Sequence, residues 1–149
     1  MTPEGSGATP EAVGPLASTG YWLHRISLAW LRDLDAALTP LGLTHTQFLV
    51  LGAVGWLSRE NETPRQQAVA DFAGVDRMMT SKVLAALEKA DLVERVPDPD
   101  DARGRLCHLT PVGRATLDAA TNEARHVDAE WFDDLHLRDS LRRQLARRG

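Results

Sequence analysis

Residues 63–95 read TPRQQAVADFAGVDRMMTSKVLAALEKADLVER. This stretch predicts a short helix followed closely by a second one. Thr63 has the chemistry of an N-cap, Pro64 suits the first helical position, and Gln66 falls at the third. Gly74 ends the short helix, because glycine readily adopts the left-handed conformation used at helix C-termini. The side that we expect to be buried consists of Val69, Phe72 and Ala73.

The second helix of this stretch begins after Asp76, whose carboxylate suits an N-cap, and continues to about Lys89. Its predicted inward face is Met79, Val83, Leu84 and Leu87. Polar and basic side chains gather at its N-terminal end, namely Arg77, Thr80, Ser81 and Lys82. A short helix, a tight turn with glycine and a second helix form a helix-turn-helix, which can hold its second helix against the major groove of DNA.

A hairpin follows, because the periodicity changes from helix to strand. Val93–Val96 and Leu106–Leu109 are predicted as two short strands. Residues 97–105 between them are rich in turn formers and too polar to bury, so we expect an exposed loop. An arginine in such a loop, Arg103, can reach a neighbouring minor groove. Asp101 is expected to pair with the Arg103 guanidinium and hold it in position.

A capping box precedes the helix-turn-helix. Thr44 and Gln47 have the required spacing, and they open a helix predicted to run through about Leu57. Together with the two helices and the hairpin that follow, this order predicts a mainly helical, α+β fold with a small β-hairpin wing. That arrangement is a winged helix-turn-helix.

The outer parts of the chain are also expected to be helical. Residues 18–42 form a helix with apolar side chains on two sides, so more than its own domain is expected to cover it. Residues 111–149 carry two further amphipathic helices. We expect these regions to be dimerisation helices around a winged helix-turn-helix domain of residues 43–110. Residues 1–17 have little to bury and are predicted to be a flexible tail.

The composition is that of a globular protein with an acidic balance. The chain has 149 residues, 43% hydrophobic and 26% charged, with a net charge of −4. One cysteine and no long apolar run predict a cytoplasmic protein without a disulfide or a membrane segment. Residues 63–110 contain seven Lys and Arg against eight Asp and Glu. This balance argues against indiscriminate binding of nucleic acid and favours a few placed contacts.

Residues 63–113 resemble the multiple antibiotic resistance regulator (MarR) family. The matching parts are Gln67-Ala-Val-Ala-Asp-Phe-Ala-Gly-Val, Leu87-Glu-Lys, Leu92-Val-Glu-Arg, Asp98-Pro, Asp101-x-Arg103, Leu109-Thr110 and Gly113, with Leu43-Thr-x-x-Gln47-Phe-x-Val-Leu51 upstream. The resemblance implies a winged-helix homodimer in which the first and last helices of both chains intertwine. It also implies a cytosolic transcription regulator, commonly a repressor, that a small ligand often releases from DNA.

The chain departs from the family pattern at two places. Asp91 stands where the family usually has glycine after the second helix, and aspartate tolerates a left-handed conformation better than most residues. We therefore expect the turn to persist. The pair Met78-Met79 replaces smaller polar residues near the start of that helix.

The sequence thus predicts a regulator that binds double-stranded DNA as a homodimer. The residues expected to meet DNA are Gln66, Arg77, Met79, Thr80, Ser81, Lys82, Asp101, Arg103 and Arg105. A two-fold dimer presents two recognition helices, so the operator is expected to be an inverted repeat with half-sites roughly 10 bp apart. The alternative is a winged helix used as a protein-interaction or dimerisation module without operator binding.

Other chemistry is not supported by the sequence motifs. The five histidines are scattered, and no Cys-x-x-Cys, His-Glu-x-x-His, phosphate-binding glycine loop or Gly-x-Ser-x-Gly is present. We therefore expect no enzymatic activity, metal or cofactor. Cys107 alternates onto the same side of its strand as Leu109, so it is predicted to be buried rather than to sense peroxide.

A small-molecule effector is expected at the family's ligand pocket. The resemblance places that pocket between the dimerisation helices and the DNA-binding lobe, near Trp22, Arg25, His45 and Phe48. Aromatic rings beside a cation suit an aromatic or anionic ligand. The alternative is that Trp22 and Phe48 belong to the core and Arg25 to the surface.

Overall fold

The structure, a computed structural model, describes residues 14–60, 62–132 and 135–148. Most of the predicted tail, residues 1–13, lies outside the described residues. Its last part is ordered: Pro15–Ala17 form a short 3-10 helix, η2, and the Trp22 indole N–H donates to the Leu16 carbonyl at 2.9 Å. The end of the predicted tail is thus joined to the start of α1 by one hydrogen bond.

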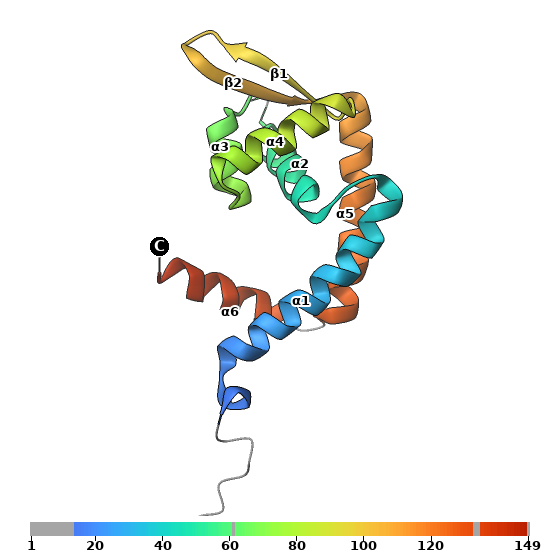
Figure 1. Ribbon diagram of the computed structural model, residues 1–149, viewed down its shortest axis with the longest axis vertical. Coiled ribbons are helices and arrows are strands. Elements are labelled where there is room, and N and C mark those ends of the chain that lie inside the picture. Colours follow the sequence, from blue (N-terminus) through green and yellow to red (C-terminus); the bar gives the residue numbers. More distant parts are fainter. Residues whose placement is uncertain (1–13, 61, 133–134, 149) are drawn as a thin grey trace, which may run out of the picture.

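Six α-helices and one hairpin make up the described part of the chain (Figure 1). In chain order they are α1 (Thr19–Leu38), the 3-10 turn η3 (Thr39–Leu41), α2 (His45–Leu57), α3 (Gln66–Ala73), α4 (Arg77–Lys89), β1 (Val93–Asp98), β2 (Asp101–Leu109), α5 (Pro111–Trp131) and α6 (Leu135–Ala146). Helices α2 to α4 form a lobe with the hairpin along one side, while α1 and α5 lie together beyond it. The predicted fold class is confirmed.

Two tryptophan–aspartate hydrogen bonds join the ends of the chain. The Trp30 indole N–H donates to Asp128 Oδ1 at 2.9 Å, and the Trp131 indole N–H donates to Asp33 Oδ2 at 2.8 Å. Both bonds connect α1 with α5: in the first the donor is on α1, and in the second the donor is on α5. The two helices outside the lobe are therefore held in a fixed register by polar contacts as well as by packing.

The helix starts mostly follow the predicted caps. The Thr44 hydroxyl accepts from the Gln47 N–H, and the Gln47 side chain accepts from the Thr44 N–H, which completes the capping box of α2. Asp76 caps α4 and Thr110 caps α5. In each case a side-chain oxygen satisfies an N–H that the helix itself leaves unpaired.

Helix α3 starts later than predicted. Thr63 is not its cap: the helix begins at Gln66 after Arg65, which has no side-chain capping bond. The residues before it pair with the hairpin instead, since the Cys107 N–H donates to the Pro64 carbonyl at 2.9 Å and Arg65 forms a bridge with Leu106. The backbone of this segment is satisfied by β2, so it does not need a helical turn.

The hairpin strands are longer than predicted. They pair antiparallel with Val93 opposite Leu109 and Pro97 opposite Arg105, and only Pro99 and Asp100 lie between them. The expected polar loop of residues 97–105 is therefore mostly strand. Pairing is regular from Val93–Leu109 to Pro97–Arg105, and the register then shifts so that Asp98 pairs with Asp101 at the tip.

The core lies among α1, α2, α4, α5 and the base of the hairpin. Its fully buried members include Leu38, Leu51, Leu84 and Cys107. Phe72 was expected among them but is 54% exposed, because it stacks on Trp56 at the surface with ring centroids 6.5 Å apart. Left-handed residues shape the turns after η3, α3 and α4: Gly42 at φ 72°, Gly74 at φ 67° and Asp91 at φ 59°. The prediction that Asp91 preserves this turn is confirmed.

In the described residues, no helix taken singly has both the length and the apolar character to span a membrane. The segments Thr19–Leu41 and His45–Leu57 are long and apolar enough only when taken together, and the chain bends by 73° between them.

Candidate nucleic-acid interface

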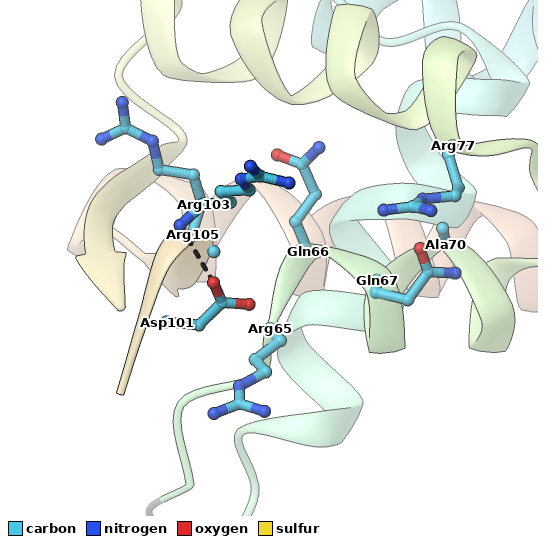
Figure 2. Close-up of a pocket in the computed structure, with 9 residues that line it drawn as sticks. Arg65, Gln66, Gln67, Ala70, Arg77, Asp101, Arg103 and Arg105 are labelled. Carbon is cyan, nitrogen blue, oxygen red and sulfur yellow. Dashed lines mark hydrogen bonds between the residues drawn. The ribbon is translucent and has the colours of Figure 1, made fainter. Parts of the chain in front are cut away.

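A cleft of about 300 Å³ lies between the hairpin and the two helices of the helix-turn-helix (Figure 2). It is lined by Arg65, Gln66, Gln67, Ala70, Arg77, Asp101, Arg103, Gly104 and Arg105. Four arginines and one carboxylate give the cleft an excess of positive charge. Such a surface suits phosphate groups, which arginine binds through its fixed fork of N–H donors.

The hairpin contributes side chains from alternate positions of β2. Asp101, Arg103 and Arg105 all line the cleft, although the strand register is irregular there: Arg105 pairs with Pro97 and Asp101 with Asp98, so β2 bulges between them. Asp101 Oδ1 accepts a hydrogen bond from the Arg103 backbone N–H at 3.0 Å. The predicted pair with the Arg103 guanidinium is not formed, and no ion pair of Arg103 occurs within the described residues. The Asp101 carboxylate therefore shapes the backbone and leaves the Arg103 guanidinium available.

Arg65 and Asp98 anchor the hairpin to the start of α3. The Arg65 Nε lies 2.6 Å from Asp98 Oδ2, in an ion pair whose geometry is not that of a directed hydrogen bond. Asp98 is only 5% exposed, and its other oxygen accepts from the Asp100 N–H at 2.9 Å. Asp98 was expected in an exposed loop, and the structure buries it instead. The Arg65 side chain remains about half exposed, so it lines the cleft while it neutralises a buried carboxylate.

Helix α4 presents most of its predicted polar residues to solvent, with one exception. Thr80 is fully buried, and its hydroxyl donates to the Val75 carbonyl at 3.3 Å. The structure therefore places Thr80 in the core rather than on the surface that we expected, because it lies on the same side of α4 as Val83, Leu84 and Leu87. Arg77 and Lys82 are exposed and Ser81 is partly exposed. Met79, which the periodicity also placed on the inward face, is 45% exposed.

The far end of α4 is tied to β1. The Glu88 carboxylate accepts from the Arg95 side chain at 2.7 Å and from the Arg95 backbone N–H at 3.2 Å. The Arg95 hydrogen bond holds the pKa of Glu88 below its ordinary value. Arg105 lies near the same pair and lines a small pocket with it. The hairpin is therefore tied to α4 through Glu88–Arg95 and to the start of α3 through Arg65–Asp98.

These contacts explain how an acidic chain presents a basic face. Asp98 is buried, Glu88 is paired with Arg95, and the Asp76 carboxylate accepts from the Met79 N–H at 2.9 Å. These three carboxylates thus serve as a cap or as ion-pair partners. The arginines on the cleft side remain exposed.

The MarR family model matches residues 43–104, which span α2 to the outer hairpin. The HTH-type transcriptional regulator YdcH from Bacillus subtilis is 34% identical over 119 residues, which cover 80% of this chain and 81% of that protein. The chain belongs to the MarR family. An HTH-type transcriptional repressor from Mycobacterium tuberculosis is 31% identical over 113 residues, covering 76% of this chain and 78% of its own length.

Solved MarR-like structures have the same fold. The transcriptional repressor CouR bound to a 23-mer DNA duplex is 30% identical, with a TM-score of 0.74, and covers 93% of this chain and 97% of that one. CouR from Rhodococcus jostii bound to p-coumaroyl-CoA gives a TM-score of 0.77 at 26% identity, with 89% and 92% covered. As a MarR family member, this chain is a DNA-binding transcription regulator and not an enzyme.

The four residues expected near the MarR effector pocket do not meet in one chain. Trp22 and Arg25 lie near the start of α1, where Arg25 stands over the Tyr21 ring at 5.9 Å. His45 begins α2 and stands edge-on to Trp30 at 5.9 Å, while Phe48 packs partly against the core. Trp22 and Trp30 are eight residues apart, roughly 12 Å along the helix. Burial is the main cause that lowers the pKa of His45.

Cys107 is fully buried, as its position on the strand predicted. Burial raises the pKa of its thiol to about 11, so the reactive thiolate is scarce at neutral pH. In the described part of the chain, no three His, Cys, Asp or Glu side chains are grouped in a way that could hold a metal ion.

Sequence reasoning missed two polar residues that line the cleft. Arg65 was assigned to a helical turn, and Gln67 was noted only for its family likeness. The position of Arg65 between a proline and a helix could have drawn attention to it. The ion pair with Asp98 could not be predicted, because Asp98 lies 33 residues later in the sequence.

Proposed function

We propose that this MarR family chain is a transcriptional repressor that binds its operator through α4 and the hairpin. The observation that carries the proposal is the cleft between the hairpin and the helix-turn-helix, which is lined by Arg65, Arg77, Arg103 and Arg105. Lys82 and Ser81 on α4 would meet base edges or phosphates in the major groove. Arg103 on the hairpin would enter the flanking minor groove, where arginine is favoured electrostatically.

We propose further that the working unit is a two-fold dimer. Leu137, Leu141 and Leu145 are exposed on α6, and Figure 1 shows α6 projecting away from α5. Trp22, Leu23, Ile26 and Leu28 are exposed on α1. Apolar surface of this extent on two helices favours burial against a second copy. Residues 18–42 and 111–149 would then be the dimerisation helices and 43–110 the DNA-binding domain of a cytoplasmic protein.

A dimer would present two copies of α4 to DNA. The operator would be an inverted repeat with half-sites roughly 10 bp apart, one turn of the double helix. Light scattering at micromolar concentration is expected to give twice the chain mass of 16.4 kDa. A stable monomer would contradict the proposed dimer. It would not contradict the proposed contacts of α4 and the hairpin with DNA, which one chain can make alone.

Arg103→Ala tests the hairpin contact. Removal of one phosphate or minor-groove contact is expected to weaken binding to most sequences and to lower the salt slope by roughly one. Fluorescence anisotropy with operator and scrambled duplexes at several salt concentrations measures both effects. Arg125→Ala on α5 is the matched control, because it removes the same charge from an exposed position outside the cleft.

A double variant on α4, Arg77→Ala with Lys82→Ala, completes this test. This double variant should bind operator DNA less tightly than the parent. If it and Arg103→Ala both bound operator DNA like the parent, the winged-helix surface would not be the DNA-binding face. The chain would then be using its winged helix for protein contacts.

We also infer that a small aromatic or anionic ligand releases the protein from DNA. Support comes from Trp22, Arg25, His45 and Phe48, which lie along α1 and at the start of α2 where a second chain would complete a pocket. CouR, a structural relative, is known bound to p-coumaroyl-CoA. Benzoate and its hydroxylated derivatives are suitable probes. An anisotropy titration should show release of the labelled operator, and Arg25→Ala should weaken that response.

A further inference from the structure

The outward face of α4 has an exposed apolar side chain, Met78, near the start of the helix. Thr80, Val83, Leu84 and Leu87 are buried and mark the inward side of the helix. At 100° per residue, the opposite side carries Met78, Lys82, Ala85 and Lys89. Met78 is 74% exposed, more than any other large apolar side chain of the lobe.

The surroundings of Met78 are polar and basic. Arg77 precedes it, Lys82 lies one turn further along the same side, and the arginines of the cleft face α4 from the hairpin. A protein partner would need a wider apolar patch around this residue. The other large apolar side chain exposed on α4 is Met79, at 45%. So small an apolar area on a basic surface instead matches the major groove, in which the thymine 5-methyl group is the apolar feature of the base edges.

We infer that Met78 is a specificity-determining residue that contacts the 5-methyl group of a thymine in each half-site. The inference rests on the proposed function, because it requires α4 to enter the major groove. Methionine suits this contact: its unbranched, polarisable side chain can settle over a methyl group without a directed hydrogen bond. Met79 lies about 100° further round the helix and is less exposed, so it is not assigned this contact.

The test first identifies the operator and then removes single methyl groups from it. The full-length protein selects binding sites from a random duplex library, and each thymine of the selected site is replaced in turn by deoxyuridine. This change keeps base pairing and removes only the 5-methyl group. One thymine per half-site is expected to stand out. Its replacement should weaken binding about fourfold, because burying a group of this size is worth about 0.8 kcal/mol and 1.4 kcal/mol is tenfold.

Protein variants assign the effect to Met78. Met78→Gln keeps the length of the side chain and makes its end polar, so its affinity should be the same for the thymine and deoxyuridine duplexes. Met78→Leu should retain the difference between them. Met79→Gln is the matched control and should behave like the parent. Circular dichroism shows that each variant is folded, and the salt slope should remain unchanged because no charge is altered.

The outcomes separate this inference from the proposed function. A selected operator whose thymines all tolerate deoxyuridine would overturn the role of Met78 and leave operator binding intact. The role of Met78 would also be overturned if Met79→Gln, rather than Met78→Gln, bound the thymine and deoxyuridine duplexes equally well. A library that yields no enriched sequence would instead overturn the proposed function, and the inference with it.

Discussion

Replacement of Gly113 by alanine tests the junction between the hairpin and α5. Gly113 lies in the first turn of α5, and its N–H donates to the Thr110 hydroxyl at 2.9 Å. An added Cβ would lie 1.8 Å from the Leu92 carbonyl oxygen, whereas real Cβ atoms essentially never approach other heavy atoms within 3.0 Å. Because the obstacle is backbone, no change of rotamer can relieve the overlap.

The expected cost follows from what must move. The start of α5 has to separate from Leu92, which stretches the hydrogen bond from the Thr110 N–H to the Leu92 carbonyl, now 3.1 Å long. Loss of one such bond costs about 1 kcal/mol. Overpacking at a tight site typically costs about 1–3 kcal/mol more. We therefore expect Gly113→Ala to lower the free energy of unfolding by about 2–4 kcal/mol.

Two glycines of α2 provide graded controls. An added Cβ at Gly52 has its nearest neighbour, Leu117 Cδ1, at 3.9 Å, so Gly52→Ala should stabilise the helix by roughly 0.5–1 kcal/mol. At Gly55 the neighbour is Leu117 Cδ2 at 2.5 Å, a side-chain atom that can rotate away, so an intermediate cost is expected. Urea unfolding followed by tryptophan fluorescence, at one protein concentration, measures all three. A Gly113→Ala protein as stable as the parent would refute the reasoning.

Two further predictions concern titratable groups. Iodoacetamide should barely label Cys107 at pH 8 until urea unfolds the protein, because burial holds the pKa of the thiol at about 11, and Cys107→Ser should leave any response of DNA binding to peroxide unchanged. Rapid labelling of the native protein, or a peroxide response that disappears in the variant, would contradict this. The Arg95 hydrogen bond lowers the pKa of Glu88 from 4.5, so the pair stabilises the fold above that value and its contribution fades as the pH falls through the lowered pKa. Urea unfolding between pH 7 and 3 should show that the stability of Glu88→Gln depends less on pH than that of the parent. The difference at pH 7 should be small because the carboxylate is 40% exposed, and identical profiles would show that the pair contributes nothing.

The parts of the fold that depend on local chemistry could be predicted from the sequence. The caps at Thr44, Asp76 and Thr110 are decided by one side chain and the N–H groups within three residues of it. Asp91 takes the left-handed conformation because the chain must turn there and aspartate tolerates it. These features need no knowledge of the distant chain.

The parts that depend on distant partners could not be predicted. Nothing near Thr63 in the sequence shows that the next residues pair with β2, 40 or so positions later. Phe72 fits an inward helical pattern, yet Trp56 offers it a surface partner. Thr80 has the polarity of a DNA contact, but the neighbouring turn supplies the Val75 carbonyl as an acceptor inside the core. In each case a tertiary contact outweighs the local preference.

The net charge illustrates why composition alone is a poor guide to this interface. Counted over residues 63–110, acids outnumber bases, which predicts a surface with little attraction for phosphate. The fold places these groups unequally: Asp98 is buried against Arg65, and Glu88 is bonded to Arg95. Each pair also fixes the hairpin relative to α3 or α4, so the same carboxylates that lower the net charge position the arginines of the cleft. Neutralising them in the sequence would raise the net charge but loosen the surface that we propose binds DNA, because a charge favours recognition only where it is held in place.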